Sequence, residues 1–465
     1  MSRLVVLATA AVLGACSLAP EYQRPAAPVA GTWPEAVSAS DRAATSLAWP
    51  AYFPDPTLQA LMSAALEHNR DMRIAVARVE EARALYGIAR ADRLPTFDLA
   101  TSRSASRTPA DLSTIGRAYT AQRYDVNVSM VSFELDFWGR VANLTEAAKA
   151  SYLATDEAQR AFRLSLVADV ANAWFSLLEM TERTAIARET LATREETLHL
   201  ITKRRDAGIA GDLDYLAADG ANQAARADLA SLERQLAAAT NALTLLVGKP
   251  LDNAAPVRKL SEQGVVADLN AGLPSDVLVQ RPDVLAAEQK LIAANANIGA
   301  ARAAFLPRIS LLGSFGTASA ALSGLFKDGS RAWTFQPALL LPLFDFGRNA
   351  ANTDVAAARK VIAVAEYERT IQQAFREVAD LLVARDKLAV QLAALEAAEK
   401  AQTERLRIAD ARYQAGISSY LEVLDAQREL YGAQQGVVQT RRAWLSTAAQ
   451  LYKALGGGDA VEKSS

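Results

Sequence analysis

The sequence predicts a mainly helical chain with a smaller β part, arranged as an internal repeat. Two segments, 141–207 and 349–415, contain neither glycine nor proline. As helices of roughly 67 residues with a rise of ~1.5 Å per residue, each would be about 100 Å long, which is wider than any compact core. Charges every few residues argue against a membrane span. Each segment has one apolar seam at three- and four-residue spacing, which favours coiled coils.

Composition and charge fit a folded chain that has no marked preference for polyanions. The chain has 465 residues, of which 51% are hydrophobic and 22% are charged, so it is long enough for two or three ordinary domains. Its 50 Lys and Arg residues are balanced by 52 Asp and Glu residues. Nucleic-acid binding therefore has little support.

Residues 1–15 have the pattern of an export signal. Arg3 supplies a positive charge, and the apolar run from Leu4 to Leu13 is too short to span a bilayer. The run ends in Leu-Gly-Ala-Cys16, which resembles a bacterial lipoprotein processing site, so we expect Cys16 to be lipidated; Ser17 after it favours sorting to the outer membrane. An ordinary cleavage site beside a chance cysteine is the alternative. Cys16 is the only cysteine, so an internal disulfide is impossible.

Residues 16–56 predict an extended arm along the outside of the folded body. Prolines recur through this stretch and exclude a long helix. The aromatic residues Trp33, Trp49 and Phe53 are the expected anchors of the arm.

The chain aligns with itself, which predicts a duplication. Ala207-Gly208-Ile209 matches Ala415-Gly416-Ile417, and Leu94-Pro95 matches Leu306-Pro307. Only two copies exist, which argues against a solenoid. We expect six parts: the signal at 1–15, the arm at 16–56, repeat 1 at 57–250, a linker or equatorial segment at 251–274, repeat 2 at 275–456, and a flexible tail at 457–465.

Each copy reads helix, strand, strand, long helix, turn and helix. The first helices, about 57–93 and 276–305, end where Leu-Pro forces an extended backbone. The long helices end at Gly208 and Gly416, where left-handed caps would reverse the chain. The last helices, about 213–247 and 420–455, then return beside them.

Alternating apolar residues predict the strands. The clearest strand has apolar residues at even positions from Tyr124 to Met130 and at odd positions from Val131 to Phe137. This change of phase suggests a bulge or a change of environment within the strand. Trp333 and Phe335 mark its counterpart in the second copy. Polar segments at 102–118 and 317–330 are the expected hairpin loops.

Four strands in an exported chain suggest a shared membrane barrel, because four strands cannot close alone. Two chains would give a filled barrel of eight strands, and three chains would give twelve strands with room for a lumen. The residues leave an alternative open, in which the hairpins pack on a soluble β-domain and the helices form a dimeric coiled coil.

The duplicated layout, the strand end Asp345-Phe346-Gly347-Arg348 and the run from Tyr413 to Arg428 resemble the TolC-like outer membrane factor family, specifically its outer membrane efflux lipoprotein branch. The resemblance covers nearly the whole chain. It implies a homotrimer with a transmembrane β-barrel of twelve strands, four from each chain, and a long coiled-coil helical barrel in the periplasm. The implied partners are a periplasmic adaptor protein, an inner-membrane pump and outer-membrane lipid.

The resemblance also implies a periplasmic gate at the end of the second helix pair. The matching positions are Arg412, Tyr413, Leu421, Asp425 and Arg428. On a three-fold axis, copies of Asp425 would form an acidic ring that attracts cations, and Leu421 would form an apolar constriction. The alternative is an ordinary exposed pair at i and i+3.

The first copy has Ala217 at the position of Asp425, so the two tips differ. The implied adaptor contact is at the turns around Gly208 and Gly416. Three aspartates of the first copy are candidate acceptors for Arg412 or Tyr413: Asp212, Asp214 and Asp219.

We expect no catalytic site, metal or cofactor. The two histidines, His68 and His199, lie in different helical segments and have no cysteine beside them, and there is no phosphate-binding glycine loop. The predicted function is a passive exit duct of a tripartite efflux system that carries drugs and other small toxic molecules and is opened by its partners. The alternatives are a duct for type I protein secretion, a periplasmic coiled-coil scaffold lipoprotein and, more remotely, an enzyme.

Overall fold

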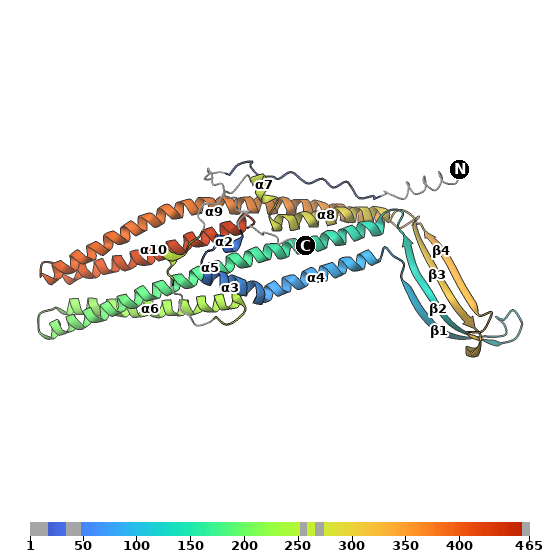
Figure 1. Cartoon of the computed structure of the whole chain (residues 1–465), viewed down its shortest axis with the longest axis horizontal. Coiled ribbons are helices and arrows are strands. Elements are labelled where there is room, and N and C mark those ends of the chain that lie inside the picture. Colours follow the sequence, from blue (N-terminus) through green and yellow to red (C-terminus); the bar gives the residue numbers. More distant parts are fainter. Residues whose placement is uncertain (1–16, 34–47, 252–257, 266–273, 458–465) are drawn as a thin grey trace. The chain divides into compact units, whose positions relative to one another are not determined.

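The computed structural model describes residues 17–33, 48–251, 258–265 and 274–457 (Figure 1). The predicted signal and the predicted lipidation at Cys16 lie outside the described residues. The described chain divides into two compact units. The sheet unit contains the four strands and the helical segments next to them, at 78–156 and 286–367, together with the first part of the arm. The helical unit contains the remaining helices.

The long helices form as predicted, within one residue at each end. Helix α5 spans Arg140–Asp206 and helix α9 spans Arg348–Gln414, each with 67 residues. An aspartate caps each start, since Asp136 accepts a hydrogen bond from the Ala142 backbone and Asp345 accepts one from the Asn349 backbone. One window of α5 is apolar enough to cross a membrane, and just over half of it is buried within the chain, as in a core helix.

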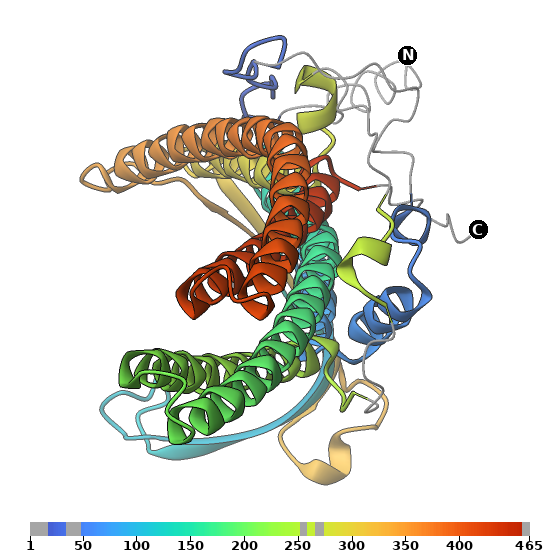
Figure 2. The same cartoon turned by 90° about the vertical axis from the view of Figure 1, so that its left-hand side faces the viewer.

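Two shorter helices return beside the long ones in the helical unit. Helix α6 spans Asp212–Val247, and helix α10 spans Tyr420–Ala454. Figures 1 and 2 show α6 beside α5 and α10 beside α9. Ion pairs tie each pair, with Arg226 bound to Glu195 in the first and Arg441 bound to Glu396 in the second. These are the two antiparallel helix pairs that the sequence predicts.

The prediction of one continuous first helix is wrong in both copies. In the first copy, α3 spans Pro56–His68 and α4 spans Arg70–Ala91. Asn69 separates them, because its side chain accepts a hydrogen bond from the Met72 backbone at 2.9 Å and so starts a new helix. Its amide also donates to the carbonyl of Leu246 at 2.9 Å. In the second copy, α7 spans Pro274–Leu278 and α8 spans Pro282–Ala303, and Pro282 begins the second helix.

The strands form one antiparallel sheet in the order β1, β2, β3, β4. Their bounds are Phe97–Thr108, Tyr119–Leu135, Arg308–Ser319 and Arg331–Leu340. Parts of the segments that we expected to be hairpin loops, 102–108 and 317–319, are strand. The sequence conceals this because polar or small residues occupy both faces there, so no apolar alternation marks the strand.

The bulge predicted in the second strand is confirmed. The pairing of β2 with β3 shifts between Met130 and Phe133, and Ser132 there has a positive φ of 55°. Two residues of β2 between these pairs face one residue of β3, and this one extra residue places Met130 and Phe133 on the same face of the sheet. The change of apolar phase in the sequence is thus offset by the bulge, and a single apolar face continues along the strand.

The second part of the arm is anchored in the helical unit by aromatic residues. Trp33 is buried and stacks on Phe375 with ring centres 5.1 Å apart. Helix α2, Trp49–Tyr52, follows, and Tyr52 stacks on Tyr452 at 4.7 Å. Phe53 is fully buried, whereas Trp49 is only half-buried. Two short 3₁₀ helices complete the described elements, η2 at Leu260–Glu262 and η3 at Leu322–Gly324.

Candidate functional site

The tips of the two helix pairs reverse the chain with the same backbone motif. Gly208 and Gly416 have φ values of 74° and 73°, a conformation that favours glycine. The Ile209 amide donates to the carbonyl of Arg204, and the Ile417 amide donates to that of Arg412, which closes a Schellman turn at each tip. A Cβ added at either glycine would meet nothing within 4 Å, so both turns are open on the outside.

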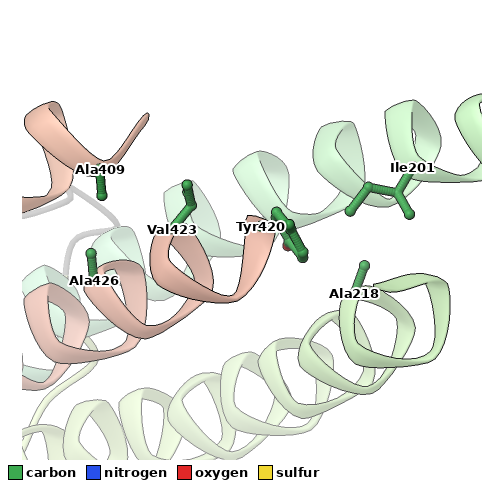
Figure 3. Close-up of a cluster of buried hydrophobic side chains, with 6 residues drawn as sticks. All are labelled: Ile201, Ala218, Ala409, Tyr420, Val423 and Ala426. Carbon is green, nitrogen blue, oxygen red and sulfur yellow. The ribbon is translucent and has the colours of Figure 1, made fainter. Parts of the chain in front are cut away.

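A small apolar cluster joins all four helices just inside the tips (Figure 3). Ile201 comes from α5, Ala218 from α6 and Ala409 from α9. Helix α10 contributes Tyr420, Val423 and Ala426. Burial raises the pKa of Tyr420, which therefore stays neutral. Three of the six residues are alanines, so the helices approach closely and little apolar area holds them together.

Asp425 is the centre of an exposed ionic cluster that joins α9 to α10. The carboxylate binds Arg405 of α9 at 2.5 Å and Arg428 of its own helix at 2.8 Å. The predicted pair at i and i+3 is thus present, and Arg405 adds a contact between helices. The Asp425 side chain is 38% exposed, so solvent screens both ion pairs. This cluster holds the helices weakly and reversibly.

An open hollow of about 640 Å³ lies beside this cluster. Arg405, Leu421, Asp425 and Arg428 line it together with alanines of α6. The Leu421 side chain is exposed, as is Arg412. The tip therefore presents charged and apolar side chains to solvent, as a surface that meets other copies or partners does.

Tyr413 contacts the other helix pair through a residue that we did not expect. Arg204 of α5 donates a hydrogen bond to the Tyr413 hydroxyl at 2.6 Å and lies over the tyrosine ring at 5.5 Å. We had considered Asp212, Asp214 or Asp219 as the partner of Tyr413, whereas in the described residues the hydroxyl of Tyr413 is bound by Arg204. Asp219 instead accepts a hydrogen bond from Gln223 on its own helix.

Two further polar contacts join the helix pairs above the tip. Tyr431 of α10 donates a short hydrogen bond to Asp228 of α6, and burial together with this bond raises the pKa of Tyr431. Arg183 of α5 donates to Gln435 of α10 at 2.5 Å. The two helix pairs are therefore linked by polar contacts that are separate from the apolar cluster.

The sequence contained a partial signal for Arg405 and none for Arg204. Arg405 and Asp425 lie at similar distances from the turn at Gly416, so an antiparallel pairing around that glycine would have brought them together. Arg204 belongs to the other copy, and its contact with Tyr413 depends on how the helix pairs pack. The two histidines lie on separate helices, His68 on α3 and His199 on α5.

Comparisons with known proteins agree with this architecture. A family model described as "Outer membrane efflux protein" matches residues 61–249 and 273–457. The outer membrane protein OprJ of Pseudomonas aeruginosa is 46% identical over 97% of this chain and 95% of its own length. The solvent efflux pump outer membrane protein SrpC of Pseudomonas putida is 43% identical over 97% of both chains.

Solved structures give the same result. The open state of the MtrE outer membrane channel of Neisseria gonorrhoeae is 40% identical, covers 95% of this chain and 98% of its own, and superposes with a TM-score of 0.86. CusC, whose structures concern folding and transmembrane channel formation, superposes with a TM-score of 0.84 at 40% identity. The match covers 95% of this chain and 100% of the CusC chain. The resemblance seen in the sequence is therefore confirmed, and the chain belongs to the outer membrane efflux protein family, the TolC-like outer membrane factors, which are transport proteins and not enzymes.

Proposed function

We propose that three copies of this chain form a gated exit duct through the outer membrane and the periplasm. The free edges of the sheet support the trimer, because β1 and β4 each pair on one side only among the described strands. An open edge in lipid would leave backbone groups unsatisfied. Three copies supply twelve strands, which close into a barrel wide enough for a lumen.

The observation that carries the gate is the ionic cluster of Asp425 with Arg405 and Arg428. It joins the second helix pair at its tip, is exposed, and borders a hollow lined by Leu421. Around a three-fold axis, three such clusters would narrow the end of the duct. Arg412, which is exposed, and Tyr413, which binds Arg204, complete the proposed gate.

The remaining parts of the proposal concern attachment and partners. We assign lipidation to Cys16 and adaptor contact to the open turns at Gly208 and Gly416. The adaptor would connect the duct to an inner-membrane pump, since the relatives are outer membrane proteins of efflux pumps. The division into a signal, an arm, two repeats, a linker and a tail belongs to the same proposal.

Small molecules are the cargo that the relatives favour. Their names specify solvent, toluene and antibiotic efflux. We therefore place export of small toxic molecules ahead of protein secretion for this chain. A scaffold without a channel would leave the free edges of β1 and β4 without a pairing partner.

The test is single-channel conductance of the full-length protein in planar bilayers. Wild type should give small, cation-selective openings, and Asp425→Ala should enlarge them several-fold because the link to Arg405 is lost. Glu404→Ala is the matched control, since Glu404 pairs at i and i+3 with Arg407 within α9 and, among the described residues, joins no second helix. It should leave the openings unchanged.

Two outcomes contradict parts of the proposal. Openings that are the same in wild type and Asp425→Ala move the gate away from this cluster but keep the duct. If no variant gives openings and the protein is soluble once its acyl group is removed, the duct is wrong and the coiled-coil scaffold lipoprotein is the remaining function.

A further inference from the structure

The register of the sheet sorts its residues onto two faces of different chemistry. Residues that pair directly across the strands point to the same side. One row joins Phe97, Met130, Gly313 and Phe335, and the next joins Leu99, Val128, Phe315 and Trp333. We call the side that carries these two rows the apolar face. Its large side chains are exposed in the single chain.

The acidic residues of the strands all lie on the opposite face, and two of them are paired. Asp98, Asp125 and Glu134 alternate with the residues of the apolar face. Asp125 binds Arg123 at 2.8 Å, and Glu134 binds Arg308 at 2.7 Å. The opposite face is therefore polar and internally neutralised, as the wall of a water-filled lumen is.

Three arginines break this division, because they lie on the apolar face without an acid beside them. Arg331 begins β4, one row beyond Trp333, and Arg103 and Arg107 lie further along β1. We call these three the outer arginines. In the part of the chain that the structure describes, none of them forms an ion pair. Arg103 lies over the ring of Tyr124, its direct partner across the strands, at 5.6 Å.

The outer arginines are confined to the end of the sheet nearest the hairpin loops. From Leu339 to Arg331 the backbone of β4 advances roughly 27 Å at about 3.4 Å per residue, which is about 19–22 Å of height for a strand tilted by about 35–45°. The apolar band of an outer-membrane barrel is about 25 Å tall. In a band that starts at Leu339, Arg331 therefore lies within the last few ångströms, where the cost of an arginine on the lipid side is falling towards zero, and Arg103 lies one row nearer the hairpin loops.

We propose that the outer arginines bind the phosphates of lipid A in the outer leaflet, and that Tyr124 and Trp333 pack beside its sugars and acyl chains. This inference depends on the proposed duct, in which the helices occupy the periplasm and the hairpin loops face outside. Lipid A carries phosphates in its head group, and in the proposed duct the outer arginines lie at the end of the sheet that reaches the outer leaflet. Arginine is suited to this role, because its planar group binds phosphate with two hydrogen bonds while it stacks on an aromatic ring.

The chemistry excludes the simpler explanation of general solubility. Charges that serve solubility occur with both signs, whereas the register-paired residues of the apolar face carry arginine and no acid. Arg123 shows the contrast, since it lies at the same level of β2 on the opposite face and is neutralised by Asp125.

The experiment is native mass spectrometry of the full-length protein in a non-ionic detergent, titrated with bisphosphorylated lipid A. We expect Arg103→Gln with Arg331→Gln to weaken retention by about thirtyfold, from roughly fivefold per arginine. Arg123→Gln removes the same charge from the other face and should retain lipid A as wild type does. Lipid A without phosphates should bind weakly to every variant.

Conductance of the same preparations separates this inference from the proposed duct. If wild type and the double variant conduct equally but also retain lipid A equally, this inference is wrong and the duct stands. If phosphatidylglycerol displaces lipid A at equal concentration, the assignment to lipid A is wrong. If wild type does not conduct at all, the barrel itself is wrong, whatever lipid is retained.

Discussion

The first part of the arm is held to the sheet unit by a buried carboxylate, and its removal should free the arm. Glu288 of α8 has a side chain that is only 7% exposed. Arg24 binds both of its oxygens at 2.7 Å, and the Tyr22 hydroxyl donates to it at 2.9 Å. We call this group the arm latch. Arg24→Ala would leave the carboxylate buried with Tyr22 as its remaining partner from the arm.

The size of the effect follows from burial and exposure together. Removing one partner of a fully buried pair costs about 3–5 kcal/mol. Arg24 is half exposed, so water compensates part of the loss, and hydrogen bonds to a charged group contribute about 1.5–3 kcal/mol. We expect about 2 kcal/mol for opening of the arm, which corresponds to roughly thirtyfold faster amide exchange in residues 18–26.

Hydrogen exchange of the detergent-solubilised protein, read by mass spectrometry, measures this directly. Glu288→Gln combined with Arg24→Ala should cost less than the sum of the single changes, because no buried charge is then left unpaired. Arg188→Ala removes an exposed pair with Glu233 in the helical unit and should leave arm exchange unchanged. If the amides of the arm exchange in Arg24→Ala at the same rate as in wild type, the arm latch is refuted.

Three further predictions follow from single residues. Gly299→Ala should loosen the arm, because the new Cβ would lie 2.7 Å from the Ala19 amide nitrogen. At Gly87 a new Cβ would meet nothing within 4 Å, so Gly87→Ala should stabilise α4 by about 0.5–1 kcal/mol. Amide exchange measures both effects. Burial and the hydrogen bond to Glu288 raise the pKa of the Tyr22 hydroxyl above its usual 10.0. The contribution of Tyr22 to the stability of the arm is therefore complete below about pH 10 and is lost only as pH rises through the raised pKa. Arm protection, corrected for intrinsic exchange, should therefore stay constant from about pH 6 to 9. Arg281→Met should lower the free energy of unfolding by about 3 kcal/mol in denaturant titration, since this arginine is 6% exposed and binds Asp283, Glu377 and the Ala454 carbonyl.

Features set by local chemistry could be predicted from the sequence. Gly208 and Gly416 were expected to end the long helices, and both have the left-handed backbone that only glycine adopts easily. The bulge near Ser132 followed from the change of apolar phase in one strand. In each case the residues that determine the feature are neighbours in the chain.

Features set by contacts between residues far apart in the chain could not be predicted from the sequence. Asn69 ends α3 partly because its amide binds Leu246, far away in the sequence. The strands continue past residue 101 through backbone pairing, although their side chains show no apolar alternation. Glu288 resembles any other helix-surface glutamate until the arm covers it. The sequence holds the partners in each case but not the packing that selects them.

The duplication itself explains why the proposed gate lies on one helix pair. Both copies reverse the chain with the same turn, so the fold of the tip does not distinguish them. At the positions of Arg405 and Asp425, however, the first copy has Thr197 and Ala217, which cannot form an ion pair. Its helices are joined near the tip by Arg194, which donates to the backbone carbonyl of Ala221 at 2.8 Å. A bond to a carbonyl carries no second charge, so salt weakens it less than an ion pair. The first pair also has exposed ion pairs, Arg226 with Glu195 and Arg188 with Glu233, so raised ionic strength should weaken ionic contacts in both pairs and spare only the Arg194 bond of the first.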